Sequence, residues 1–284
     1  MFLTRGSFRR FAQLAPAIAG VLLGGAAFAQ SASPRPAMAP HRALYELSLL
    51  KTSGEASAPV GASGRIAYDF SGSACEGYIT NFRQATEMTS PEGESVSTRM
   101  RSTSFESADH GTLNFRVESG SARGAPEITE GVASRSGDGS LSIALRRPTI
   151  TKADTDHDAL FPTDMMIRAI EAARAGQVTY STKLYDGTSE GQKVYYTLSV
   201  IGRPTSEALG DPTKDAPAMR DMRRWPVKVS YFDVAKPDSP PVYLMSFQMW
   251  ENGVSSDLVL DYGSFQLKGE LTKLEMLPQT SCGK

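Results

Sequence analysis

The sequence predicts a mainly β fold, an antiparallel sheet with one main helix in its concave side. Two observations predict it. Apolar and polar residues alternate with a period of two in one segment after another between residues 43 and 271, which is typical of strands with one buried and one wet face. A single segment, "LFPTDMMIRAIEAARAG", has helical spacing instead. One helix among many strands can fill the hollow of a curved sheet.

The chain begins with the features of a signal peptide. Arg5, Arg9 and Arg10 precede an uncharged apolar stretch that ends in Ala27-Phe28-Ala29, so we expect export and cleavage after Ala29. A transmembrane anchor is the alternative, but the uncharged run is short and rich in glycine. Residues 30–40, "QSASPRPAMAP", are polar and proline-rich and are expected to be a disordered leader. A single domain over residues 41–284 is expected to follow.

The charge balance bears on possible partners. Removing the three leader arginines from the 30 Lys and Arg residues leaves 27 against 31 Asp and Glu, a net charge of about −4. This excess of negative charge argues against nucleic acid and against overall electrostatic attraction to an anionic membrane surface. No segment after the leader holds 18 uninterrupted apolar residues, so no span is expected in the mature chain.

Strands are expected wherever the alternation recurs. In chain order the apolar stripes are Ala43 to Leu49, Ile66 to Phe70, Leu113 to Val117, Leu141 to Leu145, Val178 to Leu184, Val194/Tyr196/Leu198/Val200, Val227 to Tyr231, Tyr243 to Met249 and Phe265 to Leu271. Asn252-Gly253 predicts a type I′ hairpin, and Asp138-Gly139 predicts another turn. The segment "SVSTRMRSTSF" is polar on both faces and is expected to be an edge or solvated strand.

The helix is expected over Thr163–Ala175. Thr163 can cap its start, Asp164 lies in its positively polarised first turn, and Gly176 ends it. Met166, Ile167 and Ile170 follow helical spacing. We therefore expect this face to be buried against the sheet.

The two cysteines, Cys75 and Cys282, lie 207 positions apart. In an oxidising compartment an even number of cysteines indicates a disulfide, and two cysteines allow one pairing. The alternative is a catalytic or metal-binding thiol, which needs partners close by. The sequence has no CxxC motif and only three histidines, His41, His110 and His157.

Several other patterns bear on possible chemistry. Gly187-Thr188-Ser189-Glu190-Gly191 matches the G-x-S-x-G of serine hydrolases, but a strand pattern follows it where that motif requires a helix. The acidic run Asp154–Asp158 lacks the Gly and Glu of an EF-hand loop. Arg220, Arg223 and Arg224 form a small basic cluster that fits a solvated loop better than an anion site. We expect no catalytic residue, no metal and no cofactor, although carboxylate pairs for glycoside cleavage stay open.

The chain resembles a known family over residues 39 to about 275. The blocks that carry the likeness include "GRIAYDFSGSACEGYITNFR", "LFPTDMM", "YDGTSEGQKVYYTLSVIG", "RWPVKVSYFD" and "ENGVSSDLVLDYGSFQLKGEL". They are similar to the periplasmic cell-envelope integrity protein B (EipB) family. The resemblance implies an open β-spiral or half-barrel with the helix in its concave side, similar to lipoprotein carriers, and a disulfide between Cys75 and Cys282. It also implies periplasmic localisation and no catalytic activity.

The first functional hypothesis is therefore a non-enzymatic, monomeric envelope factor. It would bind an apolar or lipid-like ligand, or an envelope protein, between sheet and helix. The second is an interaction scaffold with a filled core, whose 95–105 region would pair with a partner strand. The third, an enzyme acting on peptidoglycan or lipid, has the least support in the sequence.

Overall fold

The fold is known from a computed structural model, which describes residues 35–55, 58–155, 158–188, 191–207, 209–236, 238–280 and 282. The predicted signal peptide and residues 30–34 lie outside this range. The described residues form a 15-stranded sheet whose spatial order is β8-β7-β6-β5-β4-β3-β2-β1-β15-β14-β13-β12-β11-β10-β9. The strands are β1(His41–Thr52), β2(Gly61–Ser73), β3(Gly77–Thr89), β4(Ser95–Glu106), β5(Thr112–Ser121), β6(Glu127–Arg135), β7(Leu141–Arg147), β8(Thr151–Thr155), β9(Ala159–Leu160), β10(Thr179–Leu184), β11(Tyr195–Ile201), β12(Arg224–Asp233), β13(Tyr243–Trp250), β14(Ser255–Asp261) and β15(Phe265–Met276).

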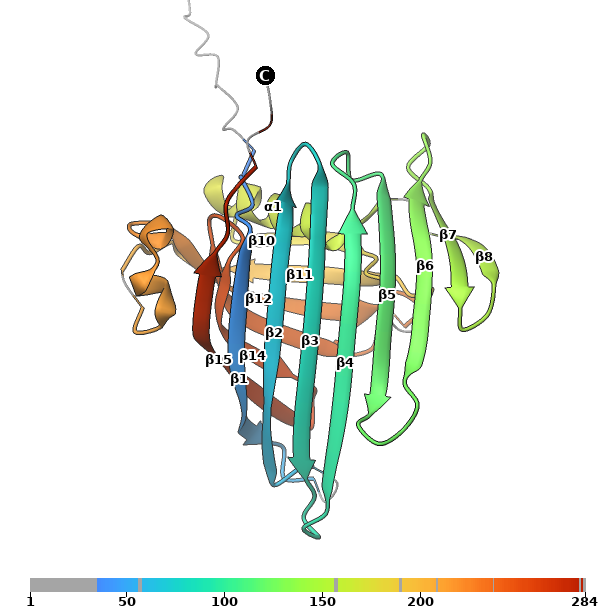
Figure 1. The fold of residues 1–284 in the computed structure, drawn as a ribbon, viewed down its shortest axis with the longest axis vertical. Helices are drawn as coiled ribbons and strands as arrows, with labels where there is room; N and C mark the ends of the chain where they lie inside the picture. The colour runs from blue at the N-terminus through green and yellow to red at the C-terminus, as the bar shows by residue number, and fades with distance from the viewer. Residues whose placement is uncertain are drawn as a thin grey trace, which may run out of the picture. The chain divides into compact units, whose positions relative to one another are not determined.

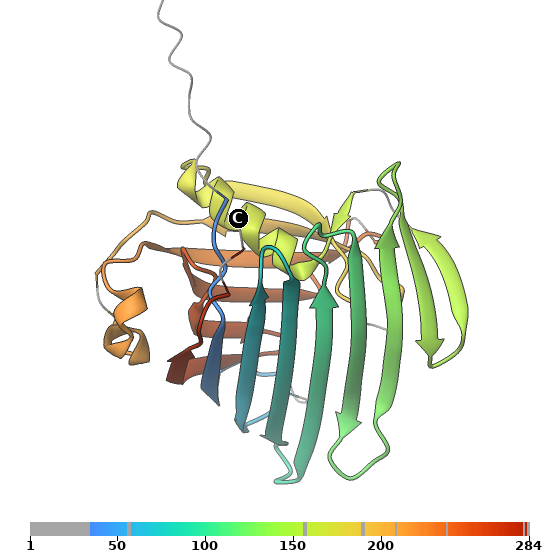
Figure 2. The same cartoon turned by 45° about the horizontal axis from the view of Figure 1, so that its top comes forward.

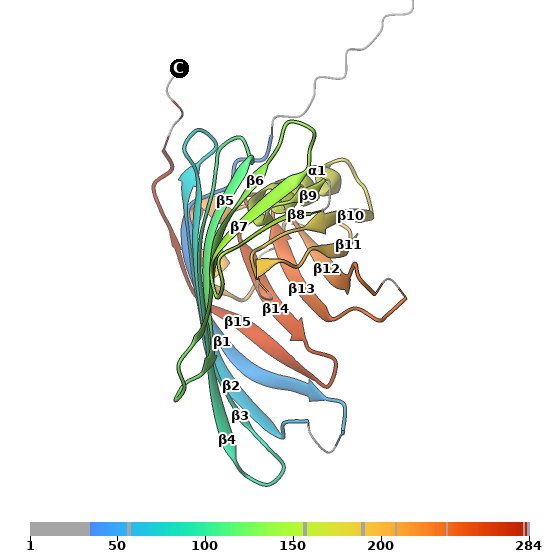
Figure 3. The ribbon, with the colours of Figure 1, turned by 90° about the vertical axis from the view of Figure 1, so that its right-hand side faces the viewer.

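The sheet is antiparallel except where the short β9 runs parallel to β10. No pairing joins β8 to β9 among the described residues, so the sheet is open. Two arms, β1–β8 and β9–β15, diverge from the β1–β15 pair in Figure 3, with α1(Pro162–Arg174) between them at one end. The predicted open, mainly β architecture with one main helix is confirmed (Figure 1).

The core lies on the concave side, where α1 meets the inner faces of both arms. Ile167 and Ile170 are almost fully buried in one cluster with residues of β1, β2 and β12–β15. Figure 2 shows α1 across one end of the strands of the first arm. The helix is rotated slightly from the expectation, because Met165 is buried while Met166 is half-buried. It begins one residue early, at Pro162, with Phe161 at the N-cap, and Thr163 makes no side-chain cap.

The segment expected to be an edge or solvated strand is β4, which is solvated but central. β4 is hydrogen-bonded to β3 on one side and to β5 on the other. It is polar on both faces because its inward residues, such as Ser102 and Ser104, lie on a half-exposed part of the concave side. Its backbone is therefore not available to pair with a partner strand.

The apolar stripe of β11 faces outward, opposite to what the alternation suggested. Tyr196 and Val200 are 40% and 51% exposed, whereas Thr197 and Ser199 are buried on the inner face. The hydroxyl of Thr197 donates to the carbonyl of Thr182 at 2.9 Å. A buried hydroxyl that is satisfied by backbone carries little burial cost, which allows this inversion.

Two local expectations also need correction. The hairpin at Asn252-Gly253 forms, but only Gly253 has a positive φ, so the turn is not type I′. The leader is packed rather than disordered from Arg35 to Pro40: Met38 is 4% exposed and belongs to the main core. The N–H of Ala39 donates to the carbonyl of Asn252. An apolar side chain and a backbone hydrogen bond together hold this segment on the sheet.

Candidate functional site

A row of aromatic rings crosses the inner face of the second arm, with one ring on or beside each strand from β11 to β15. Successive ring centroids are 6.3, 5.5, 5.2 and 5.0 Å apart along the row. We call it the aromatic row, and it consists of Tyr195, Tyr231, Tyr243, Tyr262 and Phe265. Contacting rings spaced in this way form a continuous apolar surface.

The aromatic row is partly open to solvent. Tyr262 is 40% exposed, and Tyr231, Tyr243 and Phe265 are half-buried against the core. Burial raises the pKa of Tyr231 and of Tyr243, so both phenols are neutral at physiological pH. Exposed aromatic faces with neutral hydroxyls suit an apolar chain that carries a polar end.

Within the first arm, the inner face of β3 and β4 carries more polar side chains than that of the neighbouring strands. The inward polar residues of these two strands include Thr80, Gln84, Thr86, Ser102 and Ser104, and they lie among the apolar Tyr78, Phe82 and Met100. The side chain of Gln84 counters the rise that burial causes in the pKa of Tyr262, so the two side chains lie near each other and link the aromatic row to this polar face. The concave side therefore pairs an aromatic surface with a hydroxyl- and amide-bearing one, an amphipathic arrangement.

A buried polar cluster holds the start of α1 against the first arm. The carboxylate of Glu106, at the end of β4, accepts hydrogen bonds from the backbone N–H groups of Thr163 at 2.8 Å and Asp164 at 3.0 Å. His110 Nδ1 lies 2.5 Å from the same carboxylate. Negative charge is favoured at a helix N-terminus. Glu106 therefore supplies the cap that was expected from Thr163.

The first helical turn also forms one wall of a pocket of about 620 Å³. Asp164, which is 3% exposed, accepts hydrogen bonds there from Arg35 at 3.0 Å and Arg168 at 3.1 Å. On the other side, Arg135 donates to the carbonyl of Ala159 at 2.6 Å. These charges are engaged with one another and with backbone, an arrangement that serves to fix the helix.

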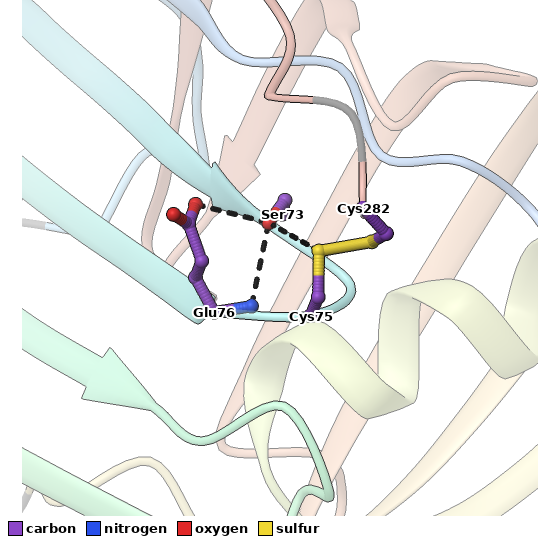
Figure 4. The surroundings of a disulfide bond; sticks show 4 residues. All are labelled: Ser73, Cys75, Glu76 and Cys282. Atoms are coloured by element: carbon purple, nitrogen blue, oxygen red, sulfur yellow. Dashed lines mark hydrogen bonds between the residues drawn. A yellow bond between two sulfur atoms is a disulfide. The ribbon is translucent and has the colours of Figure 1, made fainter. Parts of the chain in front are cut away.

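Cys75 and Cys282 are joined by a disulfide, with 5.7 Å between their Cα atoms. Cys75 lies in the turn between β2 and β3, and Cys282 lies on the tail after β15 (Figure 4). The hydroxyl of Ser73 donates to the carboxylate of Glu76 at 3.0 Å and lies 3.2 Å from the sulfur of Cys75. The bond attaches the tail to the early part of the sheet.

The histidines do not gather. His41 is buried on β1, with its ring tilted against those of Tyr68 and Phe70. His110 belongs to the helix cluster, and His157 lies outside the described residues. No group of three or more His, Cys, Asp or Glu residues within the described ranges could hold a metal ion.

The remaining patterns do not assemble a catalytic site. Gly187 and Gly191 lie in the loop between β10 and β11, while Ser189 falls outside the described residues, as do the side chains of Asp154 and Asp156. In the basic cluster, Arg223 pairs with Glu251 at 2.6 Å and Arg224 lies over the ring of Trp250. Within the part of the chain that the structure describes, no helix is both long and apolar enough to cross a bilayer.

Sequence reasoning located the aromatic row only in part. Tyr231, Tyr243 and Phe265 were in the predicted apolar stripes, but Tyr195 was assigned to the outward face and Tyr262 to no strand. One sequence feature could have located the row, because each of its aromatic residues lies close to one end of a strand. Glu106 left no local signal, because its partners are 57 and 58 positions away.

Comparisons with known proteins cover nearly the whole chain. A family model described as EipB-like matches residues 32–278. The curated "Cell envelope integrity protein EipB" of Brucella abortus (strain 2308) is 34% identical over 283 residues, which span 97% of this chain and 100% of that protein. A crystal structure described as a beta-barrel-like protein of domain of unknown function DUF1849, from Brucella abortus, aligns with a TM-score of 0.79 and 33% identity. It covers 85% of this chain and 99% of the solved one.

Proposed function

The chain belongs to the EipB-like family, and from this premise we propose that it supports cell-envelope integrity as a non-catalytic periplasmic protein that binds a lipid-like ligand. The relative from Brucella abortus is named for envelope integrity, which supports the role. The signal-peptide pattern of residues 1–29 supports export. The ligand is held on the concave side of the sheet.

The aromatic row is the observation that carries this proposal. Its rings form an apolar surface that is partly open to solvent, since Tyr262 is 40% exposed. Elsewhere on the same face of the sheet, α1 covers the apolar side chains. The polar residues of β3 and β4 face the same concave side. An acyl chain would lie against the rings, and a polar headgroup would meet the hydroxyl groups.

Native mass spectrometry of protein purified gently from the periplasm of its own organism tests the proposal directly. We expect a fraction of the protein to carry a co-purifying lipid or acyl chain. A fluorescent C16 fatty acid then serves as a defined probe for binding in solution. A clean apo mass together with no saturable binding of the probe would overturn the lipid-ligand assignment.

Tyr262→Ser and Tyr196→Ser form a matched pair of variants. Both tyrosines are 40% exposed and both contact another aromatic ring, but Tyr262 lies in the aromatic row and Tyr196 lies on the outer face against Phe232. We expect Tyr262→Ser to weaken probe binding at least fivefold, the cost of about 1 kcal/mol from one lost aromatic contact. Tyr196→Ser should leave it unchanged, and equal effects of the two would contradict the concave-side location.

A further inference from the structure

Four arginines lie together on the outer face of the first arm. Arg65 on β2 and Arg99 on β4 occupy one row across the sheet, separated by Ala85 of β3. Arg83 and Arg101 are direct cross-strand partners in the next row. All four are exposed and line one pocket of about 450 Å³, whose far side is formed by residues 120–122, Gly124 and Pro126. We call this pocket the outer arginine site.

The positive charge of the site is poorly neutralised. Arg65 pairs with Glu46 at 2.7 Å, and Glu118, which also lines the pocket, is engaged by Arg116 at 2.9 Å. In the described ranges of the chain, no ion pair or hydrogen bond involves the side chains of Arg83, Arg99 or Arg101. Like charges directly opposite each other destabilise a strand pair. Arg83 and Arg101 thus face each other at a cost that Glu118, opposite Arg101 on β5, offsets only in part because it is paired with Arg116.

The spacing indicates what would offset that cost. Strands lie about 4.8 Å apart and alternate residues of a strand about 6.8 Å apart, so the four Cα positions cover roughly 10 by 7 Å. Guanidinium groups bind phosphate and carboxylate in a bidentate manner. A tetrahedral phosphate accepts donors arriving from several directions, as they do here from three strands, whereas a carboxylate offers two oxygens in one plane. The site is also wider than one phosphate needs.

We propose that the outer arginine site binds a ligand carrying two or more phosphate groups. The site lies on the opposite face of the sheet from the aromatic row, so it stands independently of the lipid-like ligand proposed above. Such a ligand can be soluble or can be the phosphorylated headgroup of a lipid. The chemistry recognised is the same in both cases.

Isothermal titration calorimetry with tripolyphosphate and inorganic phosphate, at one fixed salt concentration, tests the soluble form. Co-sedimentation with vesicles that contain cardiolipin, whose headgroup carries two phosphates, and with phosphatidylcholine vesicles tests the headgroup. We expect saturable binding of tripolyphosphate, at least tenfold tighter than that of inorganic phosphate, or selective binding to the cardiolipin vesicles. Absence of binding in both arms would overturn the proposal.

Arg83→Ser/Arg101→Ser should reduce binding at least tenfold in whichever arm is positive, because two charge-assisted contacts are lost. Removing the opposed charges should leave the melting temperature equal or higher, so the loss cannot come from unfolding. Lys152→Ala/Lys228→Ala removes the same charge from exposed positions on the distant strands β8 and β12 and should stay within twofold of wild type. Equal weakening by both double variants would show attraction to net charge alone and would refute a defined site.

Discussion

Glu106 on β4 caps helix α1 at Thr163, which lies 57 positions later in the chain. One carboxylate oxygen accepts the N–H of Thr163 at 2.8 Å, and the other accepts the N–H of Asp164 at 3.0 Å. The side chain of Glu106 is 3% exposed and that of its neighbour His110 is 9% exposed. A single buried carboxylate therefore joins the first arm of the sheet to the only α-helix in the described part of the chain.

Glu106→Ala should destabilise the protein by about 3 kcal/mol or more, because it leaves two buried N–H donors and His110 without their acceptor. Glu118→Ala is the matched control, since Glu118 sits on the neighbouring β5 in a partly exposed pair with Arg116. It should cost less than about 1 kcal/mol. Urea unfolding of both variants measures the difference, and similar losses would show that the cap contributes nothing special.

The strands with an apolar inner stripe could be predicted from the sequence because alternation is a local signal. β1, β2, β5 and β7 follow it closely. β3 does not, since Gln84 and Thr86 point inward, and β11 inverts it by burying Thr197 and Ser199. In these strands non-local contacts decide which face is buried, and a one-dimensional pattern cannot contain them.

The candidate sites were less predictable for the same reason. The aromatic row takes one ring from each of several strands, and the outer arginine site takes its members from β2, β3 and β4. Arg83 and Arg101 are adjacent only through the register of β3 with β4. The register is fixed by the whole sheet, so two arginines that lie opposite each other on neighbouring strands can be identified only from the structure.

Ile170→Asp should prevent normal accumulation of the protein. Ile170 is fully buried where α1 meets the sheet, and an unpaired carboxylate there costs several kcal/mol. Glu171→Asp introduces the same residue one position later on the exposed side of the helix. It should cost only the small difference in helix propensity. Soluble yield and melting temperature distinguish them, and a normally abundant, equally heat-stable Ile170→Asp protein would show that α1 is peripheral.

His41 should make stability depend on pH. Its Nδ1–H donates to the carbonyl of Ala39 at 2.8 Å, and burial lowers the pKa of His41. The unfolded chain, with a histidine pKa near 6.5, then binds a proton that the folded chain does not. Stability contributed by neutral His41 is complete above about pH 6.5 and falls as the pH drops below it, by at most about 1.4 kcal/mol per pH unit.

His41→Phe tests this through the slope of the free energy of unfolding against pH. The loss of the hydrogen bond to Ala39 shifts that free energy equally at every pH and therefore leaves the slope unchanged. Urea unfolding between pH 8 and pH 5 should give a shallower dependence for the variant than for wild type. If wild type and variant showed the same pH dependence of the free energy of unfolding, His41 would have the same pKa in the folded and the unfolded chain, which would contradict the prediction.

The disulfide should contribute stability mainly through the length of chain that it closes. Cys75 and Cys282 are 207 positions apart, for which the chain-entropy model allows about 5 kcal/mol as a ceiling. Cys282→Ser should therefore lower the melting temperature by several degrees or more, since 1 kcal/mol corresponds to about 2–4 °C in a domain of this size. Differential scanning calorimetry of oxidised wild type and the variant measures it.

Dithiothreitol separates this structural role from thiol chemistry. It should lower the melting temperature of wild type towards that of Cys75→Ser/Cys282→Ser and leave the double variant unchanged. An open sheet has no closure that would hold its C-terminal tail. The N–H of Leu277 donates to the carbonyl of Pro40 at the start of the tail. The disulfide then attaches the end of the tail to the β2–β3 turn. A catalytic thiol predicts the opposite pattern, a reactive Cys75 in native protein and loss of function without loss of stability. Two free thiols in protein purified from its own organism without reductant, or equal melting points with and without reductant, would exclude the structural role.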